Sequence, residues 1–202
     1  MVPLEQLVRH VRSRRLTLAF YRRDALEVAR DLLGRTLCRR LEDGRVLRGR
    51  LVEVEAYDGP RDRASHAFRG PTPRNAPMFE AGGIAYVYLI YGVHHCLNVV
   101  TGVRGYPAAI LLRGAEPPRA ETPASGPGRL TRAFQVDRTV DGASFSGRRL
   151  WLEEGRPVAD AEVGRTRRIG VDYSGNWARR PYRFVIRNHP DLSGPTSLNR
   201  QG

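Results

Sequence analysis

The sequence predicts an α+β fold, built as a single domain over residues 1–202 around a mainly antiparallel sheet with surrounding helices. The length of 202 residues suits one well-cored domain and is short for two. Short apolar runs between turn signals recur along the chain, which is typical of strands joined by tight connections. Helical periodicity is confined to a few stretches, so the strands are not expected to alternate regularly with helices.

The first two helices are expected near the N-terminus. Residues 4–11 carry apolar side chains at helical spacing among arginines, which predicts a short amphipathic helix. This helix either docks with a solvated basic face or contacts phosphate. Residues 24–33 show the clearest helical pattern in the chain, with Asp24 as the N-cap and Gly34 as the stop.

Two strands follow, at 36–40 and 45–54, around an Asp-Gly hairpin turn at 43–44. This assignment places Glu55 at a strand end. Residues 59–77 read as a loop because four prolines and Gly70 interrupt them, and a loop of this length inside a compact domain is often functional.

The next predicted feature is a hairpin with an aromatic residue at its tip. Residues 86–91 and 95–101 are apolar and aromatic strands, and Tyr91 lies in the turn between them. A further strand is expected at 108–113, followed by an irregular proline-rich stretch over 116–128.

The last third of the chain is predicted to contain one helix and three strands. A Gly-Pro-Gly turn opens a short helix that ends at Phe134. Strands are expected at 150–152, 167–171 and 182–187. The ends of the chain, 1–16 and 190–202, are expected to be mobile.

Charge is the first functional signal. The net charge is +13 and the pI is about 11.0, a field that attracts phosphate polymers or anionic membrane surfaces. Residues 1–50 carry +7, residues 51–128 carry 0 and residues 129–202 carry +6, so a neutral centre lies between two basic flanks. All 34 basic residues are arginine, whose planar fork suits phosphate, although a coding or thermal bias would also explain the missing lysine.

The composition also excludes several kinds of chemistry. Without lysine, no side chain can form a Schiff base, so imine chemistry could come only from the N-terminal amine. The two cysteines, Cys38 and Cys96, fit no metal-binding or disulfide pattern and are expected to be buried thiols in a reducing compartment. The uncharged run 81–103 is interrupted by glycines and histidines, so no membrane span is expected. We expect a cytoplasmic location.

The candidate catalytic groups are two carboxylates. Glu53 and Glu55 are two residues apart on a predicted strand, so they point to the same face. Such a pair either binds a metal, divides acid and base roles, or forms structural ion pairs. A single buried Glu beside an aromatic side chain is a better candidate for a general base, and Glu55 with Tyr57 fits this description.

Aromatic and histidine side chains are dense in the neutral centre. They would form a core with polar rims, or a surface on which nucleic acid bases stack. Tyr91 favours the second interpretation, because a residue in a turn is not expected to be buried in a core. The group consists of Tyr57, His66, Tyr86, Tyr88, Tyr91, His94 and His95.

Seven motifs occur in an order that resembles the alkyladenine (3-methyladenine) DNA glycosylases, and the resemblance to bacterial members covers about residues 17–190. The motifs are Val-Glu-Val-Glu-Ala-Tyr at 52–57, Thr-Pro-Arg-Asn at 72–75, Tyr-Val-Tyr-Leu-Ile-Tyr-Gly at 86–92, Cys-Leu-Asn at 96–98, Leu-Leu-Arg at 111–113, Gly-Pro-Gly-Arg-Leu at 126–130 and Trp-Ala-Arg-Arg-Pro at 177–181.

The resemblance implies a curved sheet with a protruding β-hairpin that inserts into DNA. It also implies a base-flipping repair enzyme, because the glycosidic carbon is inaccessible inside a stacked duplex. The implied substrates are 3-methyladenine, 7-methylguanine, hypoxanthine and ethenoadenine in double-stranded DNA, approached from the minor groove. No cofactor and no metal are implied. The protein is expected to be associated with the nucleoid and to make no membrane contact. The sequence does not determine the oligomeric state, for which a monomer is the simplest expectation.

The same resemblance assigns roles to residues. Glu55 would activate water, with Arg113 and the Val171 carbonyl positioning it. Asn98 would reject the exocyclic amine of normal guanine. The remaining assignments are Tyr57 on one face of the base, Tyr88 with His66 on the other, Tyr91 as the intercalating residue, and Thr72, Arg74, Gly128 and Arg129 as contacts to the DNA backbone.

Because no lysine is present, a monofunctional enzyme that leaves an abasic site is expected. Two rival interpretations remain: a non-catalytic basic module that binds nucleic acid, and a metal-dependent nuclease that uses Glu53 and Glu55.

The sequence departs from the family pattern at 93–95, which is more polar than expected, and between His66 and Thr72, where the loop is one residue short.

Overall fold

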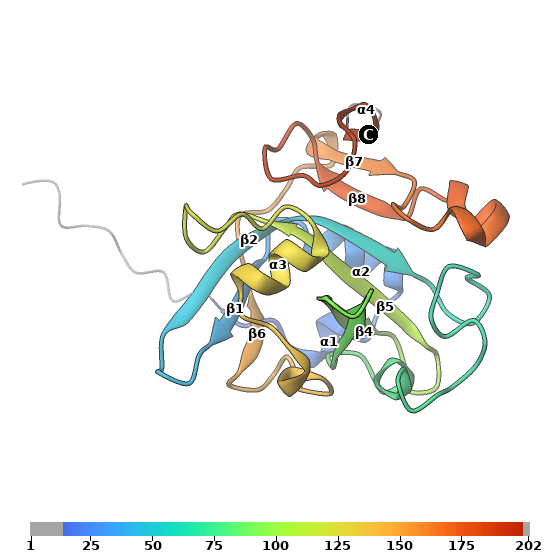
Figure 1. Ribbon diagram of the computed structural model, residues 1–202, viewed down its shortest axis with the longest axis horizontal. Helices are drawn as coiled ribbons and strands as arrows, with labels where there is room; N and C mark the ends of the chain where they lie inside the picture. Colours follow the sequence, from blue (N-terminus) through green and yellow to red (C-terminus); the bar gives the residue numbers. More distant parts are fainter. Residues whose placement is uncertain (1–13, 200–202) are drawn as a thin grey trace, which may run out of the picture.

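A curved antiparallel sheet organises the fold within residues 14–199, which the computed structural model describes. The strand order is β3-β4-β5-β2-β1-β6, and β8 pairs with β2 and with β7 (Figure 1). The α+β class and the mainly antiparallel sheet predicted from the sequence are therefore confirmed. The strands are β1 Thr36–Arg40, β2 Val46–Tyr57, β3 Ala85–Ile90, β4 His94–Thr101, β5 Ala108–Ala115, β6 Leu150–Glu153, β7 Val163–Thr166 and β8 Arg183–Ile186.

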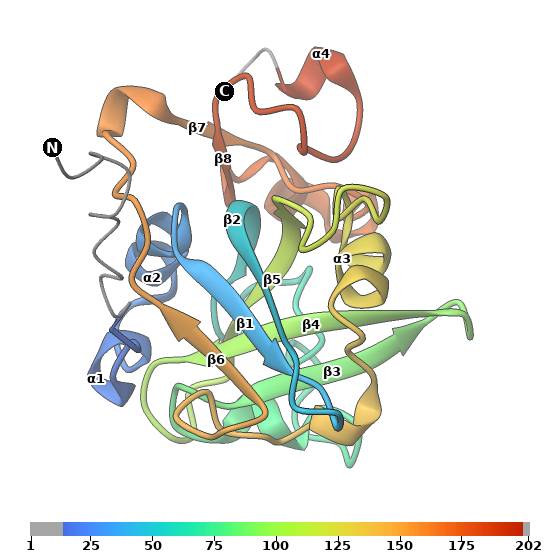
Figure 2. The same ribbon diagram turned by 90° about the vertical axis from the view of Figure 1, so that its left-hand side faces the viewer.

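Short helices cover both faces of the sheet. Helix α2 packs on β2 and β5, whereas α3 packs on β4 and β5 from the opposite side (Figures 1 and 2). The apolar sides of α2 and of the sheet meet in the main core, where residues such as Val28, Leu32 and Val54 are fully buried. The helices are α1 Leu18–Tyr21, α2 Ala25–Leu32, α3 Pro127–Ala133 and α4 Thr196–Asn199, with 3₁₀ turns η2 Ala76–Phe79, η3 Arg138–Val140, η4 Asp160–Glu162 and η5 Asp172–Arg179.

The predicted helix at 24–33 is confirmed as α2. The Asp24 carboxylate caps it by accepting hydrogen bonds from the backbone N–H groups of Leu26 (2.8 Å) and Glu27 (3.3 Å). Gly34 follows with a φ of 82°, and a Cβ there would lie 2.3 Å from the Arg156 carbonyl oxygen. Only glycine fits this stop. The helix predicted at 4–11 lies outside the described residues.

The hairpin of β1 and β2 is confirmed, but β2 is longer than expected. It continues to Tyr57, so Glu55 lies inside the strand and not at its end. The reason is that β2 changes partners: it pairs with β1 over Val46–Arg50 and with β5 and β8 around Glu55. Strand β2 therefore continues beyond residue 54, where the strand predicted from the local sequence ended.

The predicted hairpin with Tyr91 at its tip is confirmed as β3 and β4. These strands pair in register from Ala85 with Val99 to Ile90 with His94. Figure 2 shows this hairpin extending beyond the other strands of the sheet. Its residues nearest β5 stay in the sheet, since Asn98 lies opposite both Tyr86 and Leu111.

The strand predicted at 167–171 is wrong. The strand at this point of the chain is β7, Val163–Thr166, and it ends before Arg167. The next residues leave the sheet because their backbone turns towards β2, where the Ile169 N–H donates to the Glu55 carboxylate over 2.7 Å and Gly170 has a φ of 75°. Strand β8 confirms the prediction at 182–187.

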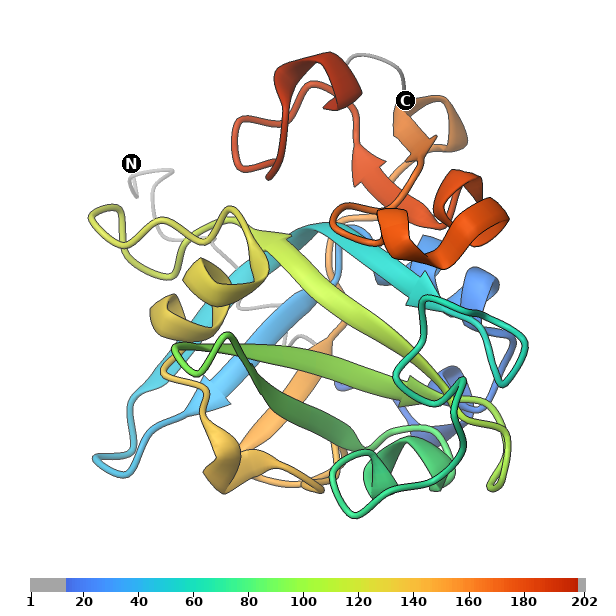
Figure 3. The same ribbon diagram turned by 45° about the vertical axis from the view of Figure 1, so that its right-hand side comes forward.

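Both described chain ends contact the sheet. Arg15 forms a β-bridge with Glu153, and the side chain of Leu16 is buried. After β8 the chain forms a compact segment with α4 above β2 and β8 (Figure 3), and Ser193 donates to Glu53. The part of the predicted mobile tail that is described, 190–199, is therefore tied to the sheet. No helix in the described part of the chain is long and apolar enough to cross a membrane.

Candidate active site

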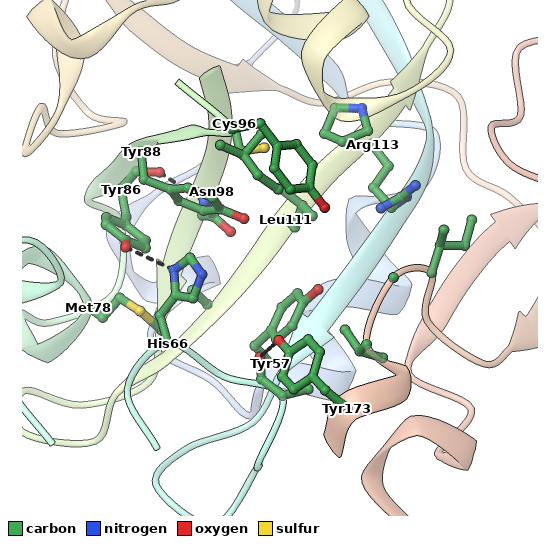
Figure 4. A pocket seen from close by; sticks show the side chains of 18 residues that line it. Tyr57, His66, Met78, Tyr86, Tyr88, Cys96, Asn98, Leu111, Arg113 and Tyr173 are labelled. Atoms are coloured by element: carbon green, nitrogen blue, oxygen red, sulfur yellow. Dashed lines mark hydrogen bonds between the residues drawn. The ribbon is translucent and has the colours of Figure 1, made fainter. Parts of the chain in front are cut away.

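A pocket of about 220 Å³ opens where the β3–β4 hairpin, the loop after β2 and the segment after β7 meet (Figure 4). The sequence predicted site residues that are far apart in the chain, and most of them line this one pocket. They are Tyr57, His66, Tyr88, Tyr91, Asn98, Arg113 and Val171. The pocket also includes Tyr173, which the sequence analysis missed.

Glu55 lies behind the wall of this pocket. Its side chain is fully buried. One carboxylate oxygen accepts from the Ile169 N–H (2.7 Å), and the other accepts from the Tyr57 hydroxyl (3.1 Å) and from Nη1 of Arg113 (3.3 Å). These three partners all line the pocket, so the carboxylate is one residue layer from its interior.

Arg113 is aimed at both carboxylates by a β-bulge. In the pairing of β2 with β5, Glu53 lies opposite Gly114 and Val54 lies opposite Leu112, which leaves Arg113 as the extra residue. Bulges of this kind redirect a side chain and are frequent beside active sites. The Nε group of Arg113 donates to Glu53 over 3.0 Å, and Nη1 donates to Glu55. Burial lowers the pKa of Arg113, but Glu55 and Glu53 outweigh it, so the pKa is raised.

Glu53 and Glu55 have different surroundings, so they do not form a symmetrical pair. Glu53 is fully buried between Arg113 and Arg183, and it also accepts hydrogen bonds from Ser193. Burial raises the pKa of Glu53, but the two guanidinium groups outweigh it and the pKa is lowered. Its oxygens are therefore committed to arginine and serine donors, which is unfavourable for the metal site considered from the sequence.

Aromatic side chains form two walls of the pocket. His66, Tyr86 and Tyr88 cluster on one side, whereas Tyr57 and Tyr173 lie on another (Figure 4). The rings of His66 and Tyr88 are 4.4 Å apart and meet edge to face at 68°, so they do not form one flat surface. Nδ1 of His66 is 3.0 Å from the Tyr86 hydroxyl. Burial, and then Arg74, lowers the pKa of His66, which keeps this ring neutral at pH 7.

A buried ion pair supports Tyr57 from behind. The Arg168 guanidinium carbon is 4.7 Å from the centroid of the Tyr57 ring. Both side chains of the pair are fully buried, and the two guanidinium nitrogens of Arg168 donate to the two oxygens of Asp62 over 2.5 and 2.9 Å. The sequence analysis missed this pair because Asp62 lies in a predicted loop and Arg168 in a wrongly predicted strand. No local pattern connects residues so far apart.

The carbonyl of Val171 already has two donors. It accepts from the Ser174 N–H over 3.0 Å and from the Ser174 hydroxyl over 2.6 Å. A carbonyl oxygen has two lone pairs. A water held by Val171 would therefore share this oxygen with Ser174 or displace its hydroxyl.

Asn98 is fixed within the sheet at the pocket wall. Its side-chain amide donates to the Tyr86 carbonyl over 3.0 Å, across the β3–β4 pair. The residue is almost completely buried, yet it lines the pocket. Rotation of the side chain would break this bond, so Asn98 presents a rigid polar edge to whatever occupies the pocket.

Two of the tyrosines that line the pocket are exposed. Tyr91 at the hairpin tip is 89% exposed and has a φ of 53°, a conformation that is uncommon outside glycine. Tyr173 on η5 is 73% exposed, and its hydroxyl donates to the Ala64 carbonyl over 3.3 Å. Two large exposed rings at one pocket favour contact with a large partner.

The predicted DNA-backbone residues surround the pocket instead of lining it. Thr72 and Arg74 border a smaller hollow of about 170 Å³ beside His66. Gly128 and Arg129 lie on α3. A Cβ on Gly128 would be 3.0 Å from the Cβ of His94, so the glycine allows α3 to pack closely on the hairpin.

Comparisons with known proteins find one matching family and several similar sequences. Residues 19–190 match the family described as methylpurine-DNA glycosylase (MPG). The chain is 50% identical over 183 residues to a protein of Anaeromyxobacter dehalogenans (strain 2CP-1), covering 90% of this chain and 86% of the relative. It is 47% identical over 188 residues to a protein of Myxococcus xanthus, covering 91% and 96%. Both relatives are named "Putative 3-methyladenine DNA glycosylase".

Proposed function

Because the chain belongs to the methylpurine-DNA glycosylase family, we propose that it flips damaged purines out of double-stranded DNA and hydrolyses their N-glycosidic bonds. The proposed substrates are 3-methyladenine, 7-methylguanine, hypoxanthine and ethenoadenine. One observation carries the proposal: a fully buried carboxylate, Glu55, lies behind an aromatic-lined pocket and is hydrogen-bonded to three residues of its wall. A pocket of this kind holds a planar base next to a proton acceptor.

The aromatic walls suit a flipped purine. Tyr57 would stack on one face of the base, and Tyr88 with His66 would contact the other face. Stacking of this kind favours electron-poor or cationic purines, because the ring faces carry negative charge. Asn98 would exclude normal guanine, since its fixed amide would collide with the exocyclic amine.

Hydrolysis requires one activated water. Glu55 would take a proton from this water as the oxygen attacks the anomeric carbon of the deoxyribose. The bond to the purine breaks at the same time, and the electron pair leaves with the base, which is either already cationic or protonated. Arg113 and the Val171 carbonyl would position the water. The product is an abasic site.

The enzyme is proposed to be monofunctional. Strand cleavage by a bifunctional glycosylase proceeds through an imine formed by a protein amine, and this chain has no side-chain amine that could form it. Trapping with borohydride on a hypoxanthine duplex should therefore give no covalent protein–DNA adduct. Efficient trapping would contradict the proposal.

DNA binding is proposed to centre on the hairpin tip. Tyr91 would enter the minor groove and fill the space left by the flipped nucleotide, as apolar wedges do in other minor-groove proteins. Thr72, Arg74, Gly128 and Arg129 would contact the backbone on either side. The protein is proposed to act as a monomer.

The proposed function is tested by incubating the protein, with a chelator present, with a duplex that contains one hypoxanthine. Hot alkali is then applied to cleave abasic sites. We expect cleavage at the lesion only after alkali treatment. Binding without cleavage would favour the non-catalytic module, and activity that disappears with the chelator would favour the metal-dependent nuclease.

Replacement of Tyr91 by Ala should weaken base flipping. Stacking of a base on an aromatic side chain is worth about 1–3 kcal/mol, so the fraction of flipped nucleotide should fall correspondingly. The measurement is the fluorescence of 2-aminopurine placed beside the lesion, titrated with enzyme. Tyr91→Phe keeps the ring and serves as the control, for which we expect a response close to that of the unchanged protein. If Tyr91→Ala gave the same fluorescence change as the unchanged protein, Tyr91 would not be the wedge.

A further inference from the structure

The C-terminal segment 191–199 reaches the catalytic centre. We infer that Ser193 is a positioning residue which, together with Glu53, holds the Arg113 guanidinium in place against Glu55. The inference rests on the proposed function, since it assigns a purpose to the orientation of Arg113. Under this inference Ser193 belongs to the active site, whereas the rest of the segment after β8 only attaches it to the sheet.

Ser193 contacts both Glu53 and Arg113. Its N–H donates to one oxygen of Glu53 over 2.6 Å, and its hydroxyl donates to the other oxygen over 2.8 Å. The same hydroxyl accepts from Nη2 of Arg113 over 3.1 Å. One buried hydroxyl therefore joins the carboxylate of β2 to the guanidinium of β5.

These contacts fix the plane of the Arg113 guanidinium. Nε is held by Glu53, Nη2 by Ser193 and Nη1 faces Glu55. A guanidinium is a rigid planar fork, so two fixed corners determine the position of the third. Without the Ser193 hydroxyl, Nη2 of Arg113 loses this partner, and the guanidinium is held only by Glu53 at Nε and by Glu55 at Nη1 itself, so Nη1 can shift relative to Glu55.

The segment is itself firmly attached. Arg183 on β8 is fully buried and donates to the Ser193 carbonyl (3.0 Å), to Oδ1 of Asn199 (2.7 Å) and to Glu53 (2.7 Å). It therefore holds the segment at two points and shares the carboxylate that Ser193 binds. The position of the segment above β8 can be followed in Figure 3.

The backbone of the segment also lies tightly on the bulge that aims Arg113. A Cβ added at Gly114 would be 2.9 Å from the Asp191 carbonyl oxygen and 3.0 Å from the Cβ of Glu53. A side chain at 114 would separate the segment from the bulge. The close approach makes the position of Ser193 depend on the same bulge as the position of Arg113.

Ser193→Ala tests the inference, with Asn199→Ala as the matched control in the same segment. Asn199 bonds Arg183 but not Arg113, so a purely structural role predicts similar effects of both changes. We expect Ser193→Ala to lower the single-turnover rate of hypoxanthine release, with enzyme saturating, by about 10- to 100-fold, the loss that follows from small misplacement of a catalytic group. The dissociation constant for the duplex should not change. Asn199→Ala should keep the rate even where it lowers the melting temperature.

A double-mutant cycle supplies the second readout. In an Arg113→Gln background, Ser193→Ala should cause no further loss of rate, because its effect passes through Arg113. Three results would overturn the inference. The first is that the losses of rate from Arg113→Gln and Ser193→Ala are additive, and the second is that Ser193→Ala releases base at the wild-type rate. The third is that Ser193→Ala and Asn199→Ala lose the same amount of rate. An active wild type with any of these results leaves the proposed function intact. A wild type that releases none of the four purines removes the proposed function and the inference together.

Discussion

Glu55→Gln is expected to lower the single-turnover rate of base release by about 10²- to 10⁴-fold, the usual contribution of a general base, while DNA binding stays intact. Glutamine has nearly the shape of glutamate, and its carbonyl oxygen can still accept from the Ile169 N–H. The amide cannot take a proton from water. The loss should therefore appear in the chemical step, with the pocket and the hairpin unchanged.

The measurement is a single-turnover assay on the hypoxanthine duplex, combined with a binding titration of the same duplex. Glu27→Gln is the matched control, because it makes the same chemical change on α2, which does not line the pocket. The control should release base at the wild-type rate. If Glu55→Gln also turned over at a near-normal rate, Glu55 would not be the base, and the carboxylate would serve only to hold Arg113 and the backbone of Ile169.

The elements that the sequence predicted correctly have strong local signals. Asp24 and Gly34 delimit α2 because capping and stop signals act within one turn of a helix. The β3–β4 hairpin has apolar strands on both sides of a turn, and its pairing depends on neighbours close in sequence. The pocket residues were assigned through a family resemblance, since neither spacing nor composition connects Tyr57 with Val171.

The features that were missed depend on contacts between distant segments. β2 extends to Tyr57 because β5 and β8 pair with it, and neither partner is visible from residues 45–54. Residues 167–171 have the composition of a strand, but the Ile169 N–H is taken by Glu55 from another part of the chain. Ser193 was assigned to a mobile tail because nothing near it indicates a buried carboxylate 140 residues earlier.

Charge was also only partly interpretable from the sequence. The excess of arginine suggested contacts to nucleic acid, yet Arg113, Arg168 and Arg183 are buried inside the protein. Each donates to a buried carboxylate. Arginine suits this role because it stays protonated and its fork satisfies several acceptors at once. Part of the arginine bias therefore belongs to buried ion pairs, and only the exposed arginines remain as candidates for the proposed contacts to DNA.

Asp62→Ala is expected to be the most destabilising of the proposed substitutions. It would leave the Arg168 guanidinium fully buried without its carboxylate, and removal of one partner of a buried pair costs about 3–5 kcal/mol. The measurement is the free energy of unfolding from urea titration. Asp160→Ala is the matched control, because Asp160 pairs with Arg30 over 2.5 Å but is 93% exposed. Exposed pairs contribute only about 0–1 kcal/mol, so the control should unfold almost like the wild type.

A double replacement separates the buried charge from the lost packing. Asp62→Leu combined with Arg168→Met replaces the pair by apolar side chains, which is often neutral or stabilising. In this protein the double variant should regain only part of the lost free energy of unfolding, because Arg168 also donates to the carbonyls of Ala56 (2.9 Å) and Trp177 (3.3 Å). Even a stable double variant should bind a lesion duplex with less flipping, because Tyr57 loses the guanidinium behind its ring. Equal unfolding free energies for Asp62→Ala and Asp160→Ala would show that the buried pair contributes no more to stability than the exposed pair.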